Sequence, residues 1–141
     1  FTNERVLTGY ICHKTGPGHT DFSTPEPVYL ESSNRIRWQK PVCVLTNRSS
    51  YSATNDFVKI TRILPLVTIV GDRTGGGSGL PFSSELPNGW SVRFSACPSF
   101  DVDMQHTEFG IDPDVKVDMS DEDCARGVDT IIEAARALLV R

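Results

Sequence analysis

The sequence predicts an α/β fold. Short apolar or alternating runs typical of strands come before and after a stretch with helical periodicity, and a second amphipathic stretch closes the chain. Hydrophobic residues make up 38% of the 141 residues. A chain of this size buries roughly 70% of the surface that its unfolded form exposes. We therefore expect one domain over residues 1–141 that needs neither disulfides nor metal to hold its core.

Charge and hydropathy exclude several classes of partner. The chain has 18 acidic and 14 basic side chains, a net charge of -4 and no cluster of Lys and Arg. We therefore expect it to bind no nucleic acid and no anionic membrane surface. Its apolar runs are only a few residues long, far short of the roughly 20 that cross a bilayer. The chain opens at Phe1 without an initiator Met or a signal-peptide pattern, so we expect a fragment or a processed form.

The four cysteines give no sign of a metal site. They form no C-x-x-C pair, and the adjacent Cys12 and His13 cannot make a tetrahedral site alone. We interpret them as buried or free thiols and expect neither a metal nor a cofactor. Whether any pair forms a disulfide stays open. The cysteines are Cys12, Cys43, Cys97 and Cys124.

Strands and loops alternate in the first third of the chain. Residues 4–14 alternate between two faces and predict a strand. Residues 15–27 are dense in Gly, Pro, Ser, Thr and Asp, which predicts a loop, and the loop-rich segment as a whole covers residues 15–37. Residues 41–47 form a short apolar run that predicts a strand buried on both faces.

Helical periodicity follows this strand directly. Four apolar residues at i, i+4, i+7 and i+11 predict an amphipathic helix of about three turns, which begins at Ser52 and is ended by Pro65. Residues 66–70 then predict a second buried strand, followed by a glycine loop over residues 71–79. The four apolar residues are Ala53, Phe57, Ile60 and Leu64.

The last third of the chain predicts a hairpin and a final helix. Asn88-Gly89 lies between two extended runs and predicts a hairpin with a type I′ turn. Residues 98–108 form an irregular acidic segment, and residues 109–118 contain a turn and a short extended piece. Asp129 is positioned to cap a last helix. Its apolar stripe comprises Ile131, Ile132, Ala135, Leu138 and Leu139.

Ser52 is the first candidate for chemistry. It lies between a buried strand and the start of a helix, where unpaired N–H groups and the helix dipole favour a developing negative charge. This position suits a nucleophile. Serine at such a position more commonly caps the helix, although Asn55 stands where a capping box has Glu or Gln. On position alone both interpretations stay open.

Other candidates carry weaker signals. The glycine loop lacks the Gly-Lys-Ser/Thr ending of a P-loop and is followed by Pro81 rather than by a helix, so we expect no nucleotide. His13, His19 and His106 could each serve as a general base, but none has a diagnostic spacing to Ser52.

Several segments in this order resemble the catalytic core of the C-terminal-processing (tail-specific) and tricorn-type serine peptidases. That family has a buried strand leading to an S-A-S-E turn whose first Ser is the nucleophile, then a G-D/E-x-T-x-G-G loop and a G-[IV]-x-P-D motif. The counterparts here are Ser52-Ala53-Thr54-Asn55, Gly71 to Gly77, and Gly110-Ile111-Asp112-Pro113-Asp114. The similarity covers residues 38–140 and includes Leu86-Pro87-Asn88-Gly89-Trp90.

The resemblance implies a serine-type endopeptidase that hydrolyses a polypeptide by acyl transfer. Ser52 is then the nucleophile, the Ala53 N–H is one oxyanion donor, and Glu108 is the acidic partner. The substrate-cleft loop comprises Gly75, Gly76 and Gly77. Tail-specific members carry a Lys base where this chain has Gly77, which excludes a Ser-Lys dyad here.

The tricorn-type branch instead pairs the Ser with a His from before the core, and an Asp-x-Arg-x-Asn-Gly-Gly segment supplies the other oxyanion donor. This chain lacks that segment. We therefore expect the upstream part of the same protein to supply both groups, and the isolated chain to be inactive.

The resemblance also implies a ClpP/crotonase-like core of β-β-α units, of which residues 1–141 are the C-terminal part, and a parent protein in the bacterial cell envelope, periplasmic or lipid-anchored. The alternative is a non-catalytic module that binds a peptide or an apolar ligand on the same fold. A crotonase-type acyl-CoA enzyme is disfavoured, because no basic cluster is present to contact phosphates.

Overall fold

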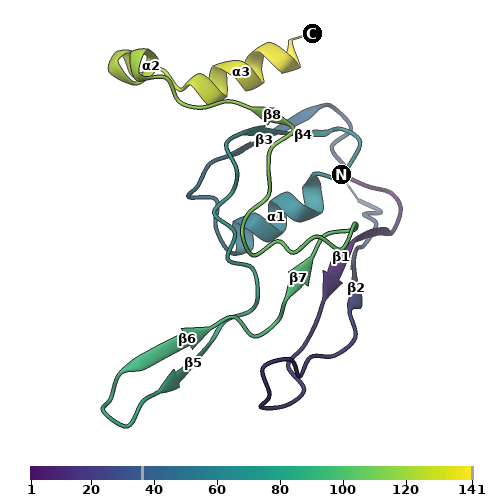
Figure 1. Ribbon diagram of the computed structural model, residues 1–141. Coiled ribbons are helices and arrows are strands. Elements are labelled where there is room, and N and C mark those ends of the chain that lie inside the picture. The colour runs from purple at the N-terminus through teal and green to yellow at the C-terminus, as the bar shows by residue number, and fades with distance from the viewer. Residues whose placement is uncertain (36, 141) are drawn as a thin grey trace.

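A three-stranded parallel sheet covered by a helix on each face forms the upper part of the molecule (Figure 1). The computed structural model describes residues 1–35 and 37–140. Its strands are ordered β3-β4-β8, with β4 in the middle. The predicted α/β fold is confirmed. The elements are β3 (Val42–Thr46), β4 (Val67–Gly71), β8 (Val115–Lys116), α1 (Ala53–Thr61) and α3 (Thr130–Leu139).

A second, antiparallel sheet lies on the other side of α1 (Figure 1). Its order is β2-β1-β7, and β1 pairs with both neighbours. A two-stranded hairpin projects away from both sheets (Figure 1). These strands are β1 (Val6–Ile11), β2 (Glu26–Leu30), β7 (Ser99–Phe100), β5 (Phe82–Glu85) and β6 (Ser91–Phe94).

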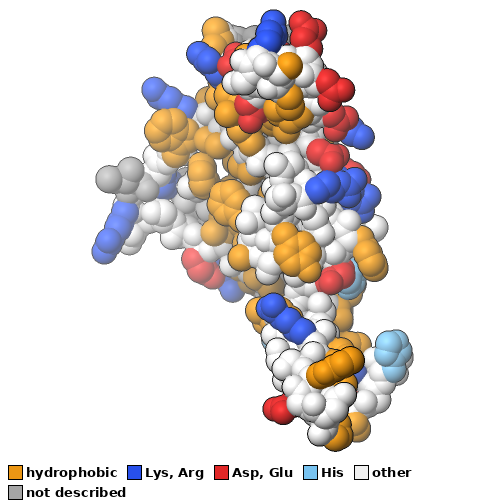
Figure 2. Space-filling model, turned by 90° about the vertical axis from the view of Figure 1, so that its left-hand side faces the viewer, with side chains coloured by type: hydrophobic (Ala, Val, Ile, Leu, Met, Phe, Trp, Pro, Cys, Tyr) orange, Lys and Arg blue, Asp and Glu red, His pale blue; other side chains and the backbone are white. Residues whose placement is uncertain are grey.

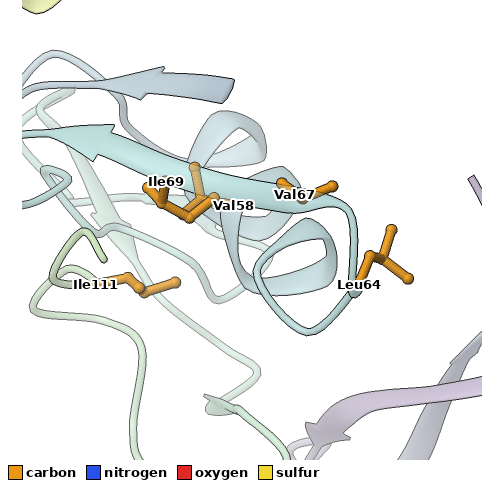
Figure 3. Packing of buried hydrophobic residues seen from close by; sticks show 5 residues of the cluster. All are labelled: Val58, Leu64, Val67, Ile69 and Ile111. Carbon is orange, nitrogen blue, oxygen red and sulfur yellow. The ribbon is translucent and has the colours of Figure 1, made fainter. Parts of the chain in front are cut away.

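The hydrophobic core lies on the two faces of β4. Val67 and Ile69 point toward α1 and pack with Val58 (Figure 3), whereas Val70 packs against α3 on the opposite face. This alternation is the two-residue period of a strand. Each such buried side chain contributes roughly 1.5–3 kcal/mol relative to exposure. The cluster on the α1 face is completed by Leu64 and Ile111.

The loop predicted over residues 15–27, within the loop-rich segment 15–37, is wrong from Glu26 onward, where β2 begins. β2 is an outer strand that pairs only with β1 among the described residues, and Pro27 lies opposite Tyr10. Proline is tolerated on such an edge, so its presence did not exclude a strand. The acidic segment likewise contains the short β7.

The buried face of α1 differs from the predicted apolar stripe. Asn55, Val58 and Lys59 are buried on it, whereas Phe57 is 47% exposed. The helix ends at Thr61, before Pro65, and Leu64 lies in the following turn. Hydrophobic periodicity missed this face because two of its polar side chains are buried with hydrogen-bond partners.

Two further strand predictions need correction. β3 is an outer strand of its sheet in the described part of the chain, so Leu45 is 42% exposed and the strand is not buried on both faces. The hairpin exists, but its turn is not type I′. A type I′ turn needs a positive φ at both Asn88 and Gly89, but only Gly89 has one. The Gly89 N–H donates to the Leu86 carbonyl at 2.8 Å. Pro87 fixes a negative φ, which fits a type I turn followed by a left-handed glycine.

The C-terminal region contains one helix more than predicted, α2 (Asp121–Arg126). Asp129 caps α3 as predicted, since its carboxylate accepts the N–H groups of Ile131 and Ile132. Of the predicted stripe, Ile131 and Ala135 are buried, whereas Ile132 and Leu139 are exposed. Within residues 1–35 and 37–140, no helix has both the length and the apolar character needed to cross a membrane.

Candidate active site

Ser52 has an unusual backbone conformation at the start of α1. Its φ is 58° and its ψ is -120°, and its side chain makes no capping hydrogen bond. A positive φ is uncommon outside glycine and costs free energy, and such strained residues cluster at functional sites. The interpretation of Ser52 as a helix cap through its side chain is therefore wrong.

The glycine loop holds Ser52 in this conformation. The Ser52 N–H donates to the Gly76 carbonyl at 2.8 Å, and the Gly75 N–H donates to the Ser50 carbonyl at 3.0 Å. These bonds surround a parallel bridge between Tyr51 and Gly76. The turn that carries Ser52 is thus fixed by backbone atoms of a loop more than twenty residues downstream.

Three consecutive glycines of this loop leave no room for a side chain. A Cβ at Gly75 would overlap the Arg48 carbonyl, one at Gly76 would overlap the Glu108 carbonyl, and one at Gly77 would overlap the Tyr51 ring. Gly76 and Gly77 also have φ values of 78° and 76°. Close backbone approach and left-handed geometry together require glycine here.

The same loop connects Ser52 to the segment that carries Glu108. The Gly77 N–H donates to the Glu108 carbonyl at 2.9 Å, next to the Gly76 bond to Ser52. The half-buried Glu108 carboxylate accepts a hydrogen bond from Ser95 Oγ at 3.3 Å. Among the described residues no hydrogen bond joins Ser52 to Glu108 directly, so the glycine loop is the link between them.

Asn55 lies at the centre of a buried polar network behind Ser52. Its Nδ2 donates to Ser78 Oγ at 2.8 Å and to the Thr107 carbonyl at 2.9 Å, and its Oδ1 accepts from Thr74 Oγ1 at 2.6 Å. Thr74 Oγ1 in turn accepts the Ile111 N–H at 2.7 Å. The network joins α1, the glycine loop and the chain on both sides of Glu108, and such fully satisfied networks hold one geometry.

Ser52 borders a cavity, and the N–H group of the next residue has no hydrogen-bond partner among the described residues. The cavity has a volume of about 180 Å³ and lies between this turn, the glycine loop and the end of β6. It is lined by Tyr51, Ser52, Gly77, Pro81, Arg93, Phe94 and Ser95. The Ala53 N–H donates no hydrogen bond to any other described residue. It lies at the N-terminus of α1, where the helix dipole favours negative charge.

His13, His106 and the buried Lys59 contact groups other than Ser52, and His19 lines a different cavity. Lys59 donates to Ser99 Oγ at 2.7 Å, and its Nζ lies 3.6 Å from Asp56 Oδ1. His13 Nδ1 lies 3.6 Å from Cys97 Sγ, and His106 packs edge-on against Phe100. In the part of the chain that the structure describes, no Lys or His hydrogen-bonds to Ser52.

Two acidic residues of the motifs have structural contacts. A hydrogen bond from the Arg73 backbone holds the pKa of Asp72 below its ordinary value, helped by the Arg48 guanidinium, whose Nε lies 3.0 Å from Asp72 Oδ2. Asp114 Oδ2 accepts the Ile69 N–H at 2.8 Å. These contacts fix the start of the glycine loop and tie the residue before β8 to β4.

Sequence reasoning missed Tyr51, Ser95 and the Asn55 network. Asn55 carried a signal, because it is a polar residue three positions after Ser52 where a capping box has Glu or Gln. Ser95 carried none, since its contact with Glu108 depends on how the hairpin rejoins the body of the molecule. All four cysteines are free, with Cys12 and Cys97 buried.

Comparison with known proteins shows the family to which the chain belongs. The model of peptidase family S41 matches residues 9–117, and the chain belongs to this family. The resemblance to C-terminal-processing peptidases is thereby confirmed.

Solved structures share the fold. A candidate peptidase from Parabacteroides merdae ATCC 43184 is 68% identical over the whole of this chain, with a TM-score of 0.94. CPAF in complex with lactacystin is 21% identical over 84% of this chain, with a TM-score of 0.72. The photosystem II D1 C-terminal processing protease is 20% identical over 83% of this chain, with a TM-score of 0.58.

The chain is shorter than all of these relatives. It covers 45% of the Parabacteroides merdae chain, 24% of the CPAF chain and 28% of the D1 protease chain. An uncharacterized protein of Chlamydia muridarum is 24% identical over 88% of this chain, which spans 22% of that protein.

Proposed function

We propose that this chain carries the nucleophile of a serine-type endopeptidase of the tail-specific and tricorn-like kind. Ser52 Oγ attacks the carbonyl carbon of a peptide bond, the amine leaves, and water hydrolyses the acyl-enzyme. The observation that carries the proposal is the strained, uncapped state of Ser52 at the N-terminus of α1. A capping bond would engage the hydroxyl, whereas here the Ser52 side chain makes no such bond and the residue lines a cavity.

In this proposal the oxyanion is held by the Ala53 N–H. The N–H is open and lies at a helix N-terminus, as an oxyanion donor requires. Glu108 orients the general base electrostatically and is itself held by Ser95. The loop of Gly75, Gly76 and Gly77 borders the substrate cleft, and Gly77 lines the cavity at Ser52.

The base comes from the upstream part of the same protein. This assignment is supported by the absence of any Lys or His bonded to Ser52 within the described residues, and by the fraction of its relatives that the chain spans. Losing one oxyanion donor typically lowers a rate about 10²- to 10³-fold. A chain without base and second donor is therefore nearly inert alone.

Two wider proposals complete this picture. Residues 1–141 form the C-terminal part of a ClpP/crotonase-like core, supported by the parallel β3-α1-β4 unit and by α3 on the opposite face. The parent protein works in the bacterial cell envelope, periplasmic or lipid-anchored. A lipoprotein of Streptococcus agalactiae shares the fold, with 14% identity and a TM-score of 0.60.

The test is intact-mass analysis of the full-length protein after treatment with a fluorophosphonate. We expect one adduct on the unaltered protein and none on the Ser52→Ala variant. Ser120→Ala is the matched control, because this serine also precedes a helix but caps it. No adduct on the unaltered protein contradicts the proposal and favours the non-catalytic binding module. Rapid labelling of the isolated 141-residue chain contradicts the upstream base.

A further inference from the structure

Another cavity is lined by charged side chains from three parts of the chain: the end of α1, the start of the glycine loop and residues 101–112. Its volume is about 280 Å³, close to the lower end of the roughly 300–1,000 Å³ of ordinary ligand pockets. It shares no lining residue with the cavity at Ser52. Its walls contain two basic and two acidic side chains, so their charges balance. These are Arg62, Arg73, Asp101 and Asp112.

Two of these four charged groups are paired with each other. Arg73 Nη1 lies 3.7 Å from Asp112 Oδ2. The same guanidinium donates through Nε to the Phe109 carbonyl at 3.1 Å and through Nη2 to the Gly110 carbonyl at 3.4 Å. Arg73 is thus fixed to residues 109–112, and its charge is balanced by Asp112 before any ligand binds.

The other two charged groups keep free binding capacity. Arg62 follows α1, and within the part of the chain that the structure describes its side chain makes no hydrogen bond and no ion pair. Asp101 Oδ1 accepts the N–H groups of Asp103 at 3.0 Å and Gln105 at 2.8 Å, whereas its Oδ2 has no partner among the same residues. A guanidinium can hold a carboxylate through two parallel N–H groups, and a carboxylate oxygen accepts from an ammonium.

His106 adds a neutral donor to the same cavity. The Glu108 N–H donates to His106 Nδ1 at 3.2 Å, so Nδ1 carries no proton in this bond. The neutral ring is therefore assigned its proton on Nε2. The ring packs edge-on against Phe100, with 5.2 Å between the ring centroids, which fixes its orientation. The walls thus offer a carboxylate a second donor besides Arg62.

The charges of the whole molecule do not favour an anion alone. Figure 2 shows basic and acidic side chains interspersed on the face that it presents, and the net charge of the chain is -4. A negative net charge does not attract anions over a long range. A ligand of this cavity is therefore selected at short range, where the walls offer one free cation and one free carboxylate oxygen.

We propose that this cavity, here called the zwitterion site, binds a free α-amino acid. The carboxylate of the amino acid binds Arg62 and the Nε2–H of His106, and its ammonium group binds Asp101 Oδ2. Desolvating a charged group is costly unless the group is paired, and a zwitterion has one group for each sign in the walls. The inference goes beyond the proposed peptidase function and does not depend on it.

The experiment measures binding of L-alanine to the full-length protein by isothermal titration calorimetry. Two analogues are matched probes, because N-acetyl-L-alanine lacks the ammonium charge and L-alaninamide lacks the carboxylate. We expect L-alanine to bind at least about tenfold more tightly than either analogue, since each analogue loses one set of charge-assisted hydrogen bonds. Equal affinity for all three compounds, or no binding of L-alanine, overturns the inference.

Two variants test the walls of the zwitterion site. Arg62→Gln and Asp101→Asn should each weaken the binding of L-alanine at least about tenfold. Asparagine keeps an Oδ1 acceptor for the two N–H groups that Asp101 holds, so the turn is retained. Arg136→Gln is the matched control, because Arg136 is paired with Glu133 on α3 and does not line this cavity. Unchanged binding in both wall variants, or an equal loss in the control, overturns the inference.

The Ser52→Ala variant separates this site from the proposed active site. We expect it to bind L-alanine as tightly as the unaltered protein does, although it takes no fluorophosphonate adduct. Loss of L-alanine binding in Ser52→Ala would assign the amino acid to the cavity at Ser52 and would overturn the inference. If the unaltered protein takes no adduct but binds L-alanine through Arg62 and Asp101, the peptidase function fails and the zwitterion site stands.

Discussion

Two serines of this molecule stand at the same place relative to a helix and behave in opposite ways. Ser120, before α2, has an extended backbone with φ -84° and ψ 144°, and its Oγ accepts the Asp123 N–H at 3.1 Å. Ser52, before α1, has φ 58° and ψ -120° and makes no capping bond. The backbone, and not the residue type, decides whether a serine caps a helix.

The difference shows that α1 lacks the stabilising side-chain cap that the other two helices have. A capping side chain typically contributes 0.5–2 kcal/mol, and both α2 and α3 have one. The first turn of α1 lacks it and instead relies on the glycine loop and on the Asn55 network. The start of α2 is stabilised by its cap, whereas the start of α1 leaves the Ser52 hydroxyl and the Ala53 N–H without a hydrogen-bond partner among the described residues.

The sharpest test of this comparison exchanges each serine for alanine in the full-length protein. We expect Ser52→Ala to lower peptide hydrolysis by at least about 10⁴-fold, with a free energy of unfolding that changes by less than about 0.5 kcal/mol. Ser120→Ala should leave hydrolysis unchanged and lower stability by about 1 kcal/mol. Peptide cleavage assays and urea unfolding check both effects. A large loss of stability in Ser52→Ala would show that its hydroxyl caps the helix after all.

The Asn55 network should give the next largest effect. Asn55→Ala leaves Thr74, Ser78 and the Thr107 carbonyl without their buried partner, and we expect a loss of about 3 kcal/mol in unfolding free energy. Labelling at Ser52 should slow as well, because the loop that fixes its backbone loosens. The exposed neighbour Thr54, replaced by alanine, is the control. Normal stability of Asn55→Ala would show that the network does not hold the α1 turn.

A side chain in the glycine loop should have a smaller effect. Gly77→Ala forces a Cβ into the Tyr51 ring at a φ of 76°, and strain of this kind costs about 1–3 kcal/mol. We expect slower labelling of Ser52 and a lower melting temperature. Adding Tyr51→Ala to make the double variant should restore part of the labelling rate and of the melting temperature. The loss that remains is then the cost of a left-handed backbone at a residue other than glycine. No restoration would show that the ring is not the obstacle.

The smallest expected effect concerns the cap of α2 and its pH dependence. Hydrogen bonds from Arg126, Thr130 and Ser120 hold the pKa of Asp123 below its ordinary value. Because the folded pKa is depressed, this stabilisation is complete above the unfolded pKa of about 3.9 and is lost as the pH falls through the folded value. The Asp123→Asn variant should therefore have a lower melting temperature than the unaltered protein at pH 7. The two should melt at the same temperature at a pH below the folded pKa of Asp123. Glu122→Gln is the control and should change little at either pH.

Much of this arrangement could be predicted from the sequence, and the exceptions have physical causes. β4, the hairpin and the Asp129 cap follow from local patterns of alternation, turn residues and capping. β2 was missed because an edge strand tolerates Pro27, and α2 because its polar turn has no apolar stripe.

The candidate site shows the same limit. The motifs indicated Ser52, the glycine loop and Glu108, but not that Ser52 avoids capping, since that depends on hydrogen bonds from residues far along the chain. Asn55 and Lys59 face inward because each has a buried hydrogen-bond partner there. A pattern of hydrophobic residues cannot predict such partners.

The ring of Tyr51 over Gly77 has a consequence for how such proteins diverge. Any side chain at position 77 meets this ring, so a larger residue there needs a second change at Tyr51. The two positions are therefore expected to vary together among related sequences rather than one at a time.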